Sequence, residues 1–123
     1  MTTFRAVFYS FATLLLWGQN CFAAADHSDR RATAIYTNCA GCHGAQGEGS
    51  DGPAFSGNAT LQNADYVVWK ILAGSQHMPS FTEQLPDAQI AAIASYIRSQ
   101  WGNHFRPAVT VQQVQRMRLL LAR

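Results

Sequence analysis

The stretch Cys39-Ala40-Gly41-Cys42-His43 is the part of the sequence from which the fold is predicted. It has the pattern CxxCH, in which two thiols three residues apart are followed directly by an imidazole. This pattern is the attachment signature of a c-type haem. Two thiols at this spacing can add across the two vinyl groups of one porphyrin, and the histidine is then placed under the iron. We therefore predict one haem c bound covalently to Cys39 and Cys42, with His43 as an axial iron ligand.

Two other kinds of site use closely spaced cysteines. A dithiol redox motif requires a strand that leads into a helix of an α/β fold, whereas this sequence contains helical patterns only. A tetrahedral zinc site requires four ligands, and the chain has neither a second CxxC nor a paired-histidine motif. We therefore favour haem over both alternatives.

The iron of such a haem needs a sixth ligand or an open face. Met78 is followed by Pro79 in a segment between two predicted helices, and a proline-constrained loop can present a thioether rigidly, so we predict Met78 as the second axial ligand. The rival ligand His77 is expected to point away to the surface, and Met117 is interpreted as core filling. Ligation by His43 and Met78 closes both faces of the iron, which favours transfer of single electrons over catalysis.

The first 25 residues follow the three-part pattern of a secretory signal peptide. A mildly positive start is followed by a 12-residue apolar run, residues 6–17, and Ala23-Ala24-Ala25 supplies a cleavage site. A membrane-spanning helix needs about 20 apolar residues, so we predict cleavage and export to the periplasm rather than an uncleaved anchor. No second apolar run is long enough to span a bilayer, so the mature chain is expected to have no transmembrane anchor.

The charge of the chain is nearly balanced overall but unevenly distributed. Its 123 residues hold nine Lys and Arg against seven Asp and Glu, a formal net charge of +2. This balance argues against a nucleic-acid binder that depends on phosphate contacts. Residues 26–105 carry a net charge of −3, whereas residues 106–123 carry four arginines and no acid. We expect this basic end to dock either on a partner or on the body of the protein itself.

The remaining pattern predicts an all-α chain with glycine-rich loops. A first helix is expected from Ser28 or Asp29 to about Cys39, because apolar residues recur there at helical spacing. The other predicted helices are a short one capped by Asn63 and stopped by Gly74, a strong one with Pro86 at its first position and Gly102 at its end, and a last one opened by a capping box from Thr110 to Gln113.

Residues 29–101 resemble a class I cytochrome c. The resemblance rests on a set of short motifs in the order typical of that family: Cys39-x-x-Cys42-His43-Gly44, Gly47-x-Gly49, Gly52-Pro53, Met78-Pro79-x-Phe81 and Tyr96-Ile97-Arg98. It implies a small cytochrome c fold, with helices wrapped around one covalently bound haem. It divides the chain into a signal peptide at residues 1–25, a cytochrome c domain at residues 26–105 and a basic C-terminal helical extension at residues 106–123.

The resemblance also implies contacts within the site and the core. The carbonyl of Pro53 is expected to accept a hydrogen bond from the second ring nitrogen of His43, which fixes the imidazole. The first and last core helices are expected to cross. Their meeting side chains would be Ile93, Tyr96 and Ile97 on one helix and Ile35 and Tyr36 on the other.

The segment from Tyr96 to Val114 is most similar to monohaem cytochrome domains and subunits of bacterial periplasmic dehydrogenases that act on alcohols, gluconate and sugars. This similarity implies a periplasmic dehydrogenase as electron donor and a downstream cytochrome or terminal oxidase as acceptor. The expected function is therefore single-electron transfer and not catalysis. The alternative is a haem enzyme or ligand sensor in which Met78 is a labile sixth ligand.

Overall fold

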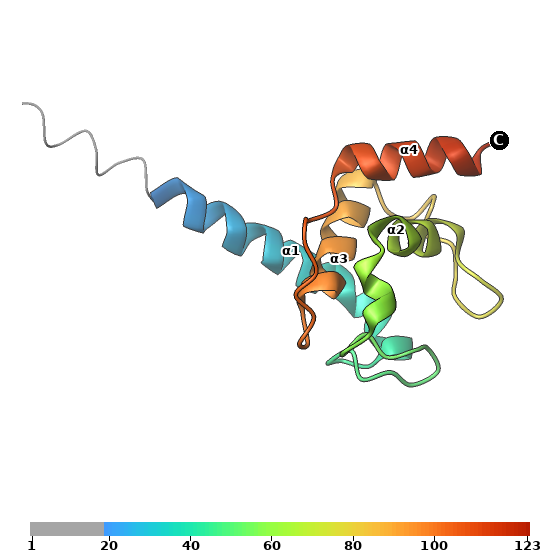
Figure 1. Cartoon of the computed structure of the whole chain (residues 1–123), viewed down its shortest axis with the longest axis horizontal. Helices are drawn as coiled ribbons and strands as arrows, with labels where there is room; N and C mark the ends of the chain where they lie inside the picture. The colour runs from blue at the N-terminus through green and yellow to red at the C-terminus, as the bar shows by residue number, and fades with distance from the viewer. Residues whose placement is uncertain (1–18) are drawn as a thin grey trace, which may run out of the picture.

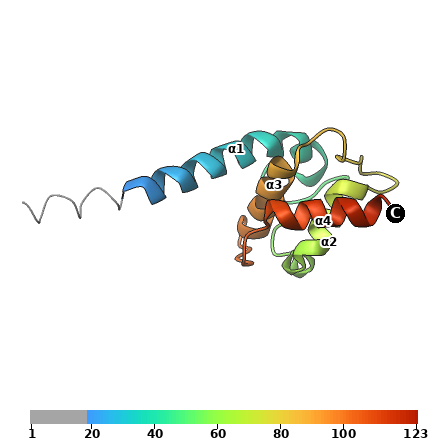
Figure 2. The same cartoon turned by 90° about the horizontal axis from the view of Figure 1, so that it is seen from above.

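The computed structural model describes residues 19–123, which form α-helices and one short 3₁₀ helix with no strand in this range. The elements are α1 Gln19–His43, η1 Ala59–Gln62, α2 Ala64–Ala73, α3 Asp87–Ser99 and α4 Val111–Leu121. The C-terminal part of α1 packs on α3, and α2 and α4 pack on α3 and on each other (Figure 1). Figure 2 shows from above that α1 runs along one edge of the molecule and that α4 lies across the side that faces the viewer. The all-α prediction is confirmed.

Helix α1 is longer than the sequence pattern predicted. It begins at Gln19 and continues to His43, so the CxxCH motif forms its last turn. The upstream extension contains the run Ala23-Ala24-Ala25, and alanine has the highest helix propensity. The helix ends where Gly44 adopts a φ of 84°, a conformation that glycine adopts without strain. The predicted signal peptide lies mostly outside the described residues, and its cleavage stays a prediction.

The predicted meeting of the first and last core helices is present as a contact between α1 and α3. The rings of Tyr36 and Tyr96 lie 5.8 Å apart between their centroids. The side chains of Ile35, Ile93 and Ile97 line one common cavity. These contacts hold the helix that carries the CxxCH motif in a fixed position relative to α3.

The caps of α2 agree with the prediction, whereas the ends of α3 do not. The Asn63 side chain accepts a hydrogen bond from the Tyr66 N–H, and Gly74 ends α2 with a φ of 68°. Pro86 occupies the N-cap position of α3 rather than its first turn. The prediction that α3 runs to Gly102 was also wrong, because the helix stops at Ser99.

The early end of α3 has a tertiary cause. The buried Asn103 side chain donates hydrogen bonds to the carbonyls of Ile97, at 3.2 Å, and Phe55, at 2.8 Å. Asn103 therefore satisfies a carbonyl in the last turn of α3 and joins it to the loop before η1. Trp101 then adopts a φ of 52°, and its ring lies 4.8 Å from the ring of Tyr36.

Helix α4 packs on the body of the protein. The predicted capping box is present, since the Gln113 N–H donates to the Thr110 hydroxyl and the Thr110 N–H donates to the Gln113 side chain. Val114 is fully buried against the core. Leu119, Leu120 and Leu121 in the last turns are exposed. None of the helices in residues 19–123 is both long and apolar enough to cross a membrane.

Candidate functional site

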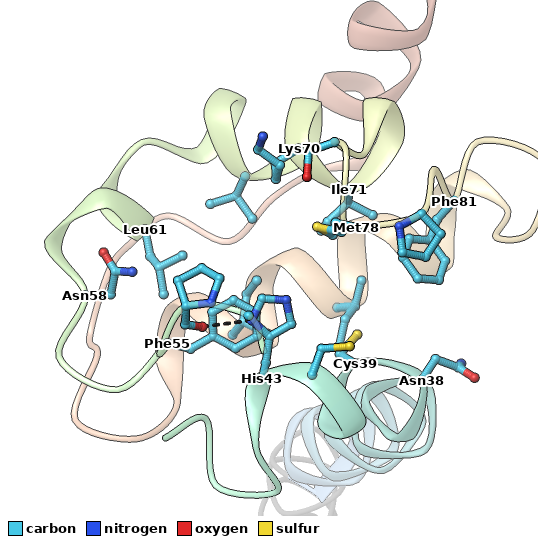
Figure 3. A pocket seen from close by; sticks show the side chains of 18 of the residues that line it. Asn38, Cys39, His43, Phe55, Asn58, Leu61, Lys70, Ile71, Met78 and Phe81 are labelled. Carbon is cyan, nitrogen blue, oxygen red and sulfur yellow. Dashed lines mark hydrogen bonds between the residues drawn. The ribbon is translucent and has the colours of Figure 1, made fainter. Parts of the chain in front are cut away.

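A cavity of about 560 Å³ lies between α1, α2, α3 and the loops that join them (Figure 3). This volume is within the range of about 300–1,000 Å³ that is common for ligand sites. Most of its wall is apolar. The apolar side chains that line it are Ile35, Phe55, Leu61, Val67, Ile71, Phe81, Leu85, Ile93 and Ile97. The predicted site residues Cys39, Cys42, His43, Pro53 and Met78 all line the same cavity.

His43 is buried and held on several sides. Its Nδ1 lies 2.8 Å from the carbonyl oxygen of Pro53, the contact marked by a dashed line in Figure 3. The ring of Phe55 is stacked on the imidazole, with 4.1 Å between centroids and an interplanar angle of 17°. Because Nδ1 is engaged by a carbonyl, Nε2 is the nitrogen left to bind a metal ion.

The two thiols lie on the α1 side of the cavity. Cys39 is half-buried, Cys42 is exposed, and both are free. Burial, with a smaller contribution from Cys42, raises the pKa of the Cys39 thiol to about 11. Reactive dithiol motifs lower a cysteine pKa to increase the thiolate fraction, so this environment is opposite to theirs. The Cys39 thiol therefore lacks the lowered pKa that a reactive dithiol motif uses.

A zinc site also lacks support. Within the part of the chain that the structure describes, no group of three or more His, Cys, Asp or Glu side chains is arranged to hold a metal ion. A structural zinc site needs four such ligands. The described residues therefore do not provide the ligands of a tetrahedral zinc site.

Met78 reaches the cavity from the loop between α2 and α3, on the side opposite His43 (Figure 3). The loop folds back on the end of α2. The Ser75 N–H donates to the Met78 carbonyl at 2.8 Å, and the Phe81 N–H donates to the Ile71 carbonyl at 3.1 Å. At Gly74, an added Cβ would lie 2.5 Å from the Met78 carbonyl oxygen, so the turn needs a glycine there.

Of the two rival ligands, only His77 lies at this cavity. His77 is exposed at the rim of the cavity. Met117 packs against the core from α4 and is absent from the residues that line the cavity. The structure therefore brings the Met78 thioether, the His43 imidazole and the two thiols to one cavity, with His77 at its rim.

The sequence motifs include Gly52 and Arg98, but they did not predict what these residues contact, and Phe55 had no signal of its own. Gly52 leaves room for the His43 ring, since a Cβ there would lie 2.8 Å from its Cε1 atom. Phe55 stacks on that ring, although a single aromatic residue in a loop predicts no such role. Arg98 is 1% exposed behind the cavity wall, although a charged residue on a helix is usually exposed.

The residues present fit a covalently attached porphyrin with an iron atom. Two thiols lie at one wall, where they can form thioether bonds. An imidazole with one engaged nitrogen and a thioether lie on opposite sides of an apolar cavity. This donor set, with apolar walls around it, is the one that His/Met-ligated haem requires.

The comparisons with known proteins identify the family of the chain. Residues 26–97 match the family model described as cytochrome c oxidase, cbb3-type, subunit III. The chain is 31% identical to a cytochrome c-552 of Thermus thermophilus, over 85% of this chain and 82% of that protein. It is 32% identical to a cytochrome c6 of a Synechococcus species, over 72% of this chain and 82% of the relative.

Proposed function

This chain belongs to the class I cytochromes c, as a monohaem electron carrier, and from that premise we propose how its residues hold the haem and what it serves. Cys39 and Cys42 form the two thioether bonds. His43 would bind the iron through Nε2, and the Met78 thioether would supply the second iron ligand. The observation that carries this assignment is the position of His43 and Met78 on opposite sides of one apolar cavity that also contains both cysteines.

The protein's own residues set the conditions for electron transfer. Bound haem supplies an iron that changes between the ferrous and ferric states by one electron. The Pro53 carbonyl holds the Nδ1–H of His43, which fixes the orientation of the imidazole. The Met78 thioether closes the other face and favours the ferrous state. The apolar walls exclude water and disfavour the additional positive charge of the ferric state.

We place the protein in the periplasm, after removal of residues 1–25 as a signal peptide. Its proposed donor is a periplasmic dehydrogenase, and its proposed acceptor is a downstream cytochrome or a terminal oxidase. The similarity of the segment from Tyr96 to Val114 to cytochrome subunits of such dehydrogenases supports the donor. The description of the matching family model, a subunit of a cytochrome c oxidase, supports an acceptor of the oxidase class.

Absorption spectra of the purified holoprotein test the site. We expect one haem per chain, a ferric charge-transfer band typical of methionine–iron ligation, and a spectrum that moderate cyanide or, for the ferrous protein, carbon monoxide leaves unaltered. Ready binding of carbon monoxide would contradict the carrier assignment and support the haem enzyme or ligand sensor. Absence of covalent haem would contradict the attachment to Cys39 and Cys42.

The proposed donor is tested separately by reduction kinetics. Ferric protein is mixed with the periplasmic fraction of its source organism, and an alcohol, gluconate or a sugar is added to separate samples. We expect rapid reduction with one of these substrates. The growth of the ferrous absorption band measures its rate. Equal, slow reduction with and without every substrate would contradict a dehydrogenase of these three classes as donor.

A further inference from the structure

Arg98 is a buried cation at the end of α3. It is 1% exposed, and its guanidinium is enclosed by three backbone carbonyls. Nε donates to the Leu61 carbonyl at 2.9 Å, Nη1 to the Pro107 carbonyl at 2.7 Å and Nη2 to the Gln62 carbonyl at 3.3 Å. All the partners of its side chain are therefore uncharged.

No carboxylate compensates this charge in the part of the chain that the structure describes. The Asp and Glu side chains described there are exposed, except Asp87, which pairs with Arg118. Desolvation accordingly lowers the pKa of Arg98, although a guanidinium still stays protonated at neutral pH. The charge is thus buried, permanent and without a counter-ion among these residues.

The buried charge lies directly behind the wall of the haem cavity. Leu61 lines the cavity with its side chain, and its carbonyl oxygen accepts the hydrogen bond from Arg98. Ile97, the residue before Arg98, also lines the cavity. Leu61 therefore both lines the space in which the electron is gained or lost and binds the guanidinium.

A purely structural role does not explain why this position holds a charge. Replacement of buried ionic groups by apolar residues of similar volume is often neutral or stabilising, because desolvation of a charge is costly. Carbonyl groups can be satisfied by neutral donors as well. An uncompensated cation beside a redox site has a direct electrostatic effect on that site, and burial protects this effect from solvent.

We propose that Arg98 raises the reduction potential of the haem through its unpaired buried charge, an inference that rests on the haem site proposed above. Reduction adds one negative charge to the cavity, so a cation behind the wall stabilises the reduced state. The interaction passes through a poorly polarisable interior, where it is stronger than in water. It is also weakly screened, because dissolved ions do not enter the space between the two charges.

Two substitutions separate the charge from the hydrogen bonds. Arg98→Gln removes the charge, whereas Arg98→Lys keeps the charge and loses the planar fork that binds three carbonyls. We expect both variants to unfold at a lower temperature than the wild type. We expect the midpoint potential, measured by spectroelectrochemical titration at pH 7, to fall in Arg98→Gln and to stay near the wild-type value in Arg98→Lys.

The exposed Arg106 offers a matched control, because it lies next to the Pro107 that binds Arg98. Arg106→Gln removes a solvated charge, so any shift in its potential should disappear in 1 M salt, where the Debye length is about 3 Å. The fall in Arg98→Gln should persist in 1 M salt. A wild-type potential in Arg98→Gln, or equal falls in Arg98→Gln and Arg98→Lys, would overturn the proposal.

The result does not depend on one variant folding. Arg98→Met is a second neutral substitution of similar length and is expected to show the same fall in potential. If neither neutral variant yields a folded holoprotein, a shifted potential in Arg98→Lys alone still overturns the proposal, and an unchanged one supports it. Haem content is measured for each sample: wild-type protein without covalent haem refutes the proposed site, whereas unchanged potentials in haem-loaded variants refute only the role of Arg98.

Discussion

The backbone of Gly52 lies directly against the imidazole ring of His43. A Cβ atom placed on Gly52 would lie 2.8 Å from Cε1 and 2.9 Å from Nδ1 of that ring. The Gly52 N–H also donates to the Cys42 carbonyl at 2.8 Å. The last turn of α1 and the Gly52-Pro53 loop therefore form one structural unit, and this unit fixes the imidazole of His43.

Substitution Gly52→Ala should disturb the iron–imidazole bond. The ring cannot move aside freely, because Phe55 is stacked on it. We expect a loss of about 1–3 kcal/mol in the free energy of unfolding, the usual cost of overpacking, together with a changed ferric spectrum. Gly41→Ala is the control, since a Cβ there meets nothing within 4 Å and alanine favours a helix. Wild-type spectra and stability in Gly52→Ala would show that the close contact is unimportant.

Substitution Met78→Ala should open one face of the iron without releasing the haem. The haem stays attached through Cys39 and Cys42, the midpoint potential falls because the thioether is lost, and the ferrous protein binds carbon monoxide. Met117→Leu is the control and should keep the wild-type spectrum, with a stability change below about 1.5 kcal/mol. A changed spectrum in Met117→Leu would make that residue the ligand in place of Met78.

The contribution of Tyr36 to the stability of the protein should be lost in strong alkali. Burial is the main cause that raises the pKa of Tyr36 to about 12, and its hydroxyl donates to the Gly44 carbonyl at 2.6 Å. The unfolded chain loses this proton near pH 10, whereas the folded protein keeps it to about pH 12. The contribution of Tyr36 to stability is therefore complete below pH 10 and is lost as pH rises to about 12.

Denaturant unfolding of Tyr36→Phe between pH 8 and pH 12 checks this expectation. At neutral pH the variant should lose about 1 kcal/mol with the hydrogen bond to Gly44. Above pH 10, the free energy of unfolding of the variant should fall less steeply than that of the wild type. The difference in free energy between the two proteins should therefore become smaller. Parallel curves of the free energy of unfolding against pH would mean that Tyr36 has the same pKa in the folded and unfolded states.

Arg118 should stabilise both α4 and the loop that carries Met78. It pairs with Asp87 and donates to the carbonyls of Thr82, at 2.7 Å, and Leu85, at 2.8 Å. Arg118→Gln should lower the free energy of unfolding by about 2 kcal/mol and increase binding of carbon monoxide to the ferrous protein.

The neighbouring Arg116 provides the comparison for this substitution. Arg116 is exposed, so Arg116→Gln should change the stability by less than about 0.5 kcal/mol. Thermal unfolding and a carbon monoxide titration measure both variants. Equal effects in Arg116→Gln and Arg118→Gln would show that net charge, and not the contacts of Arg118, is responsible.

Local signals predicted much of the fold. Asn63, Gly74 and Thr110 act where the sequence placed them, because each satisfies backbone groups within a few residues of itself. The end of α3 could not be predicted in this way. It depends on Asn103 and its hydrogen bond to Phe55, a residue 48 positions away in the chain.

The sequence allows a site to be proposed where one motif contains the chemistry. The CxxCH pattern predicts the roles of Cys39, Cys42 and His43, and the proline-constrained loop predicts Met78 as the second ligand. The surroundings of these residues depend on tertiary packing, for which the sequence holds no local pattern. The charge of Arg98 is the clearest example, since its burial results from three carbonyls contributed by η1 and by the segment after α3.

The residues that would bind the haem and the residue that supports the Met78 loop lie in different parts of the chain. The part that matches the family model, residues 26–97, contains every proposed haem ligand. Arg118 lies outside it and holds the loop segment between Met78 and α3. Proteolysis after residue 110 would therefore leave the attachment motif complete, but it would remove the buried Val114 from the core and the contacts of Arg118 with the loop after Met78. Cytochromes that share the matched part and differ after it can differ in their affinity for small gases with no change at the metal.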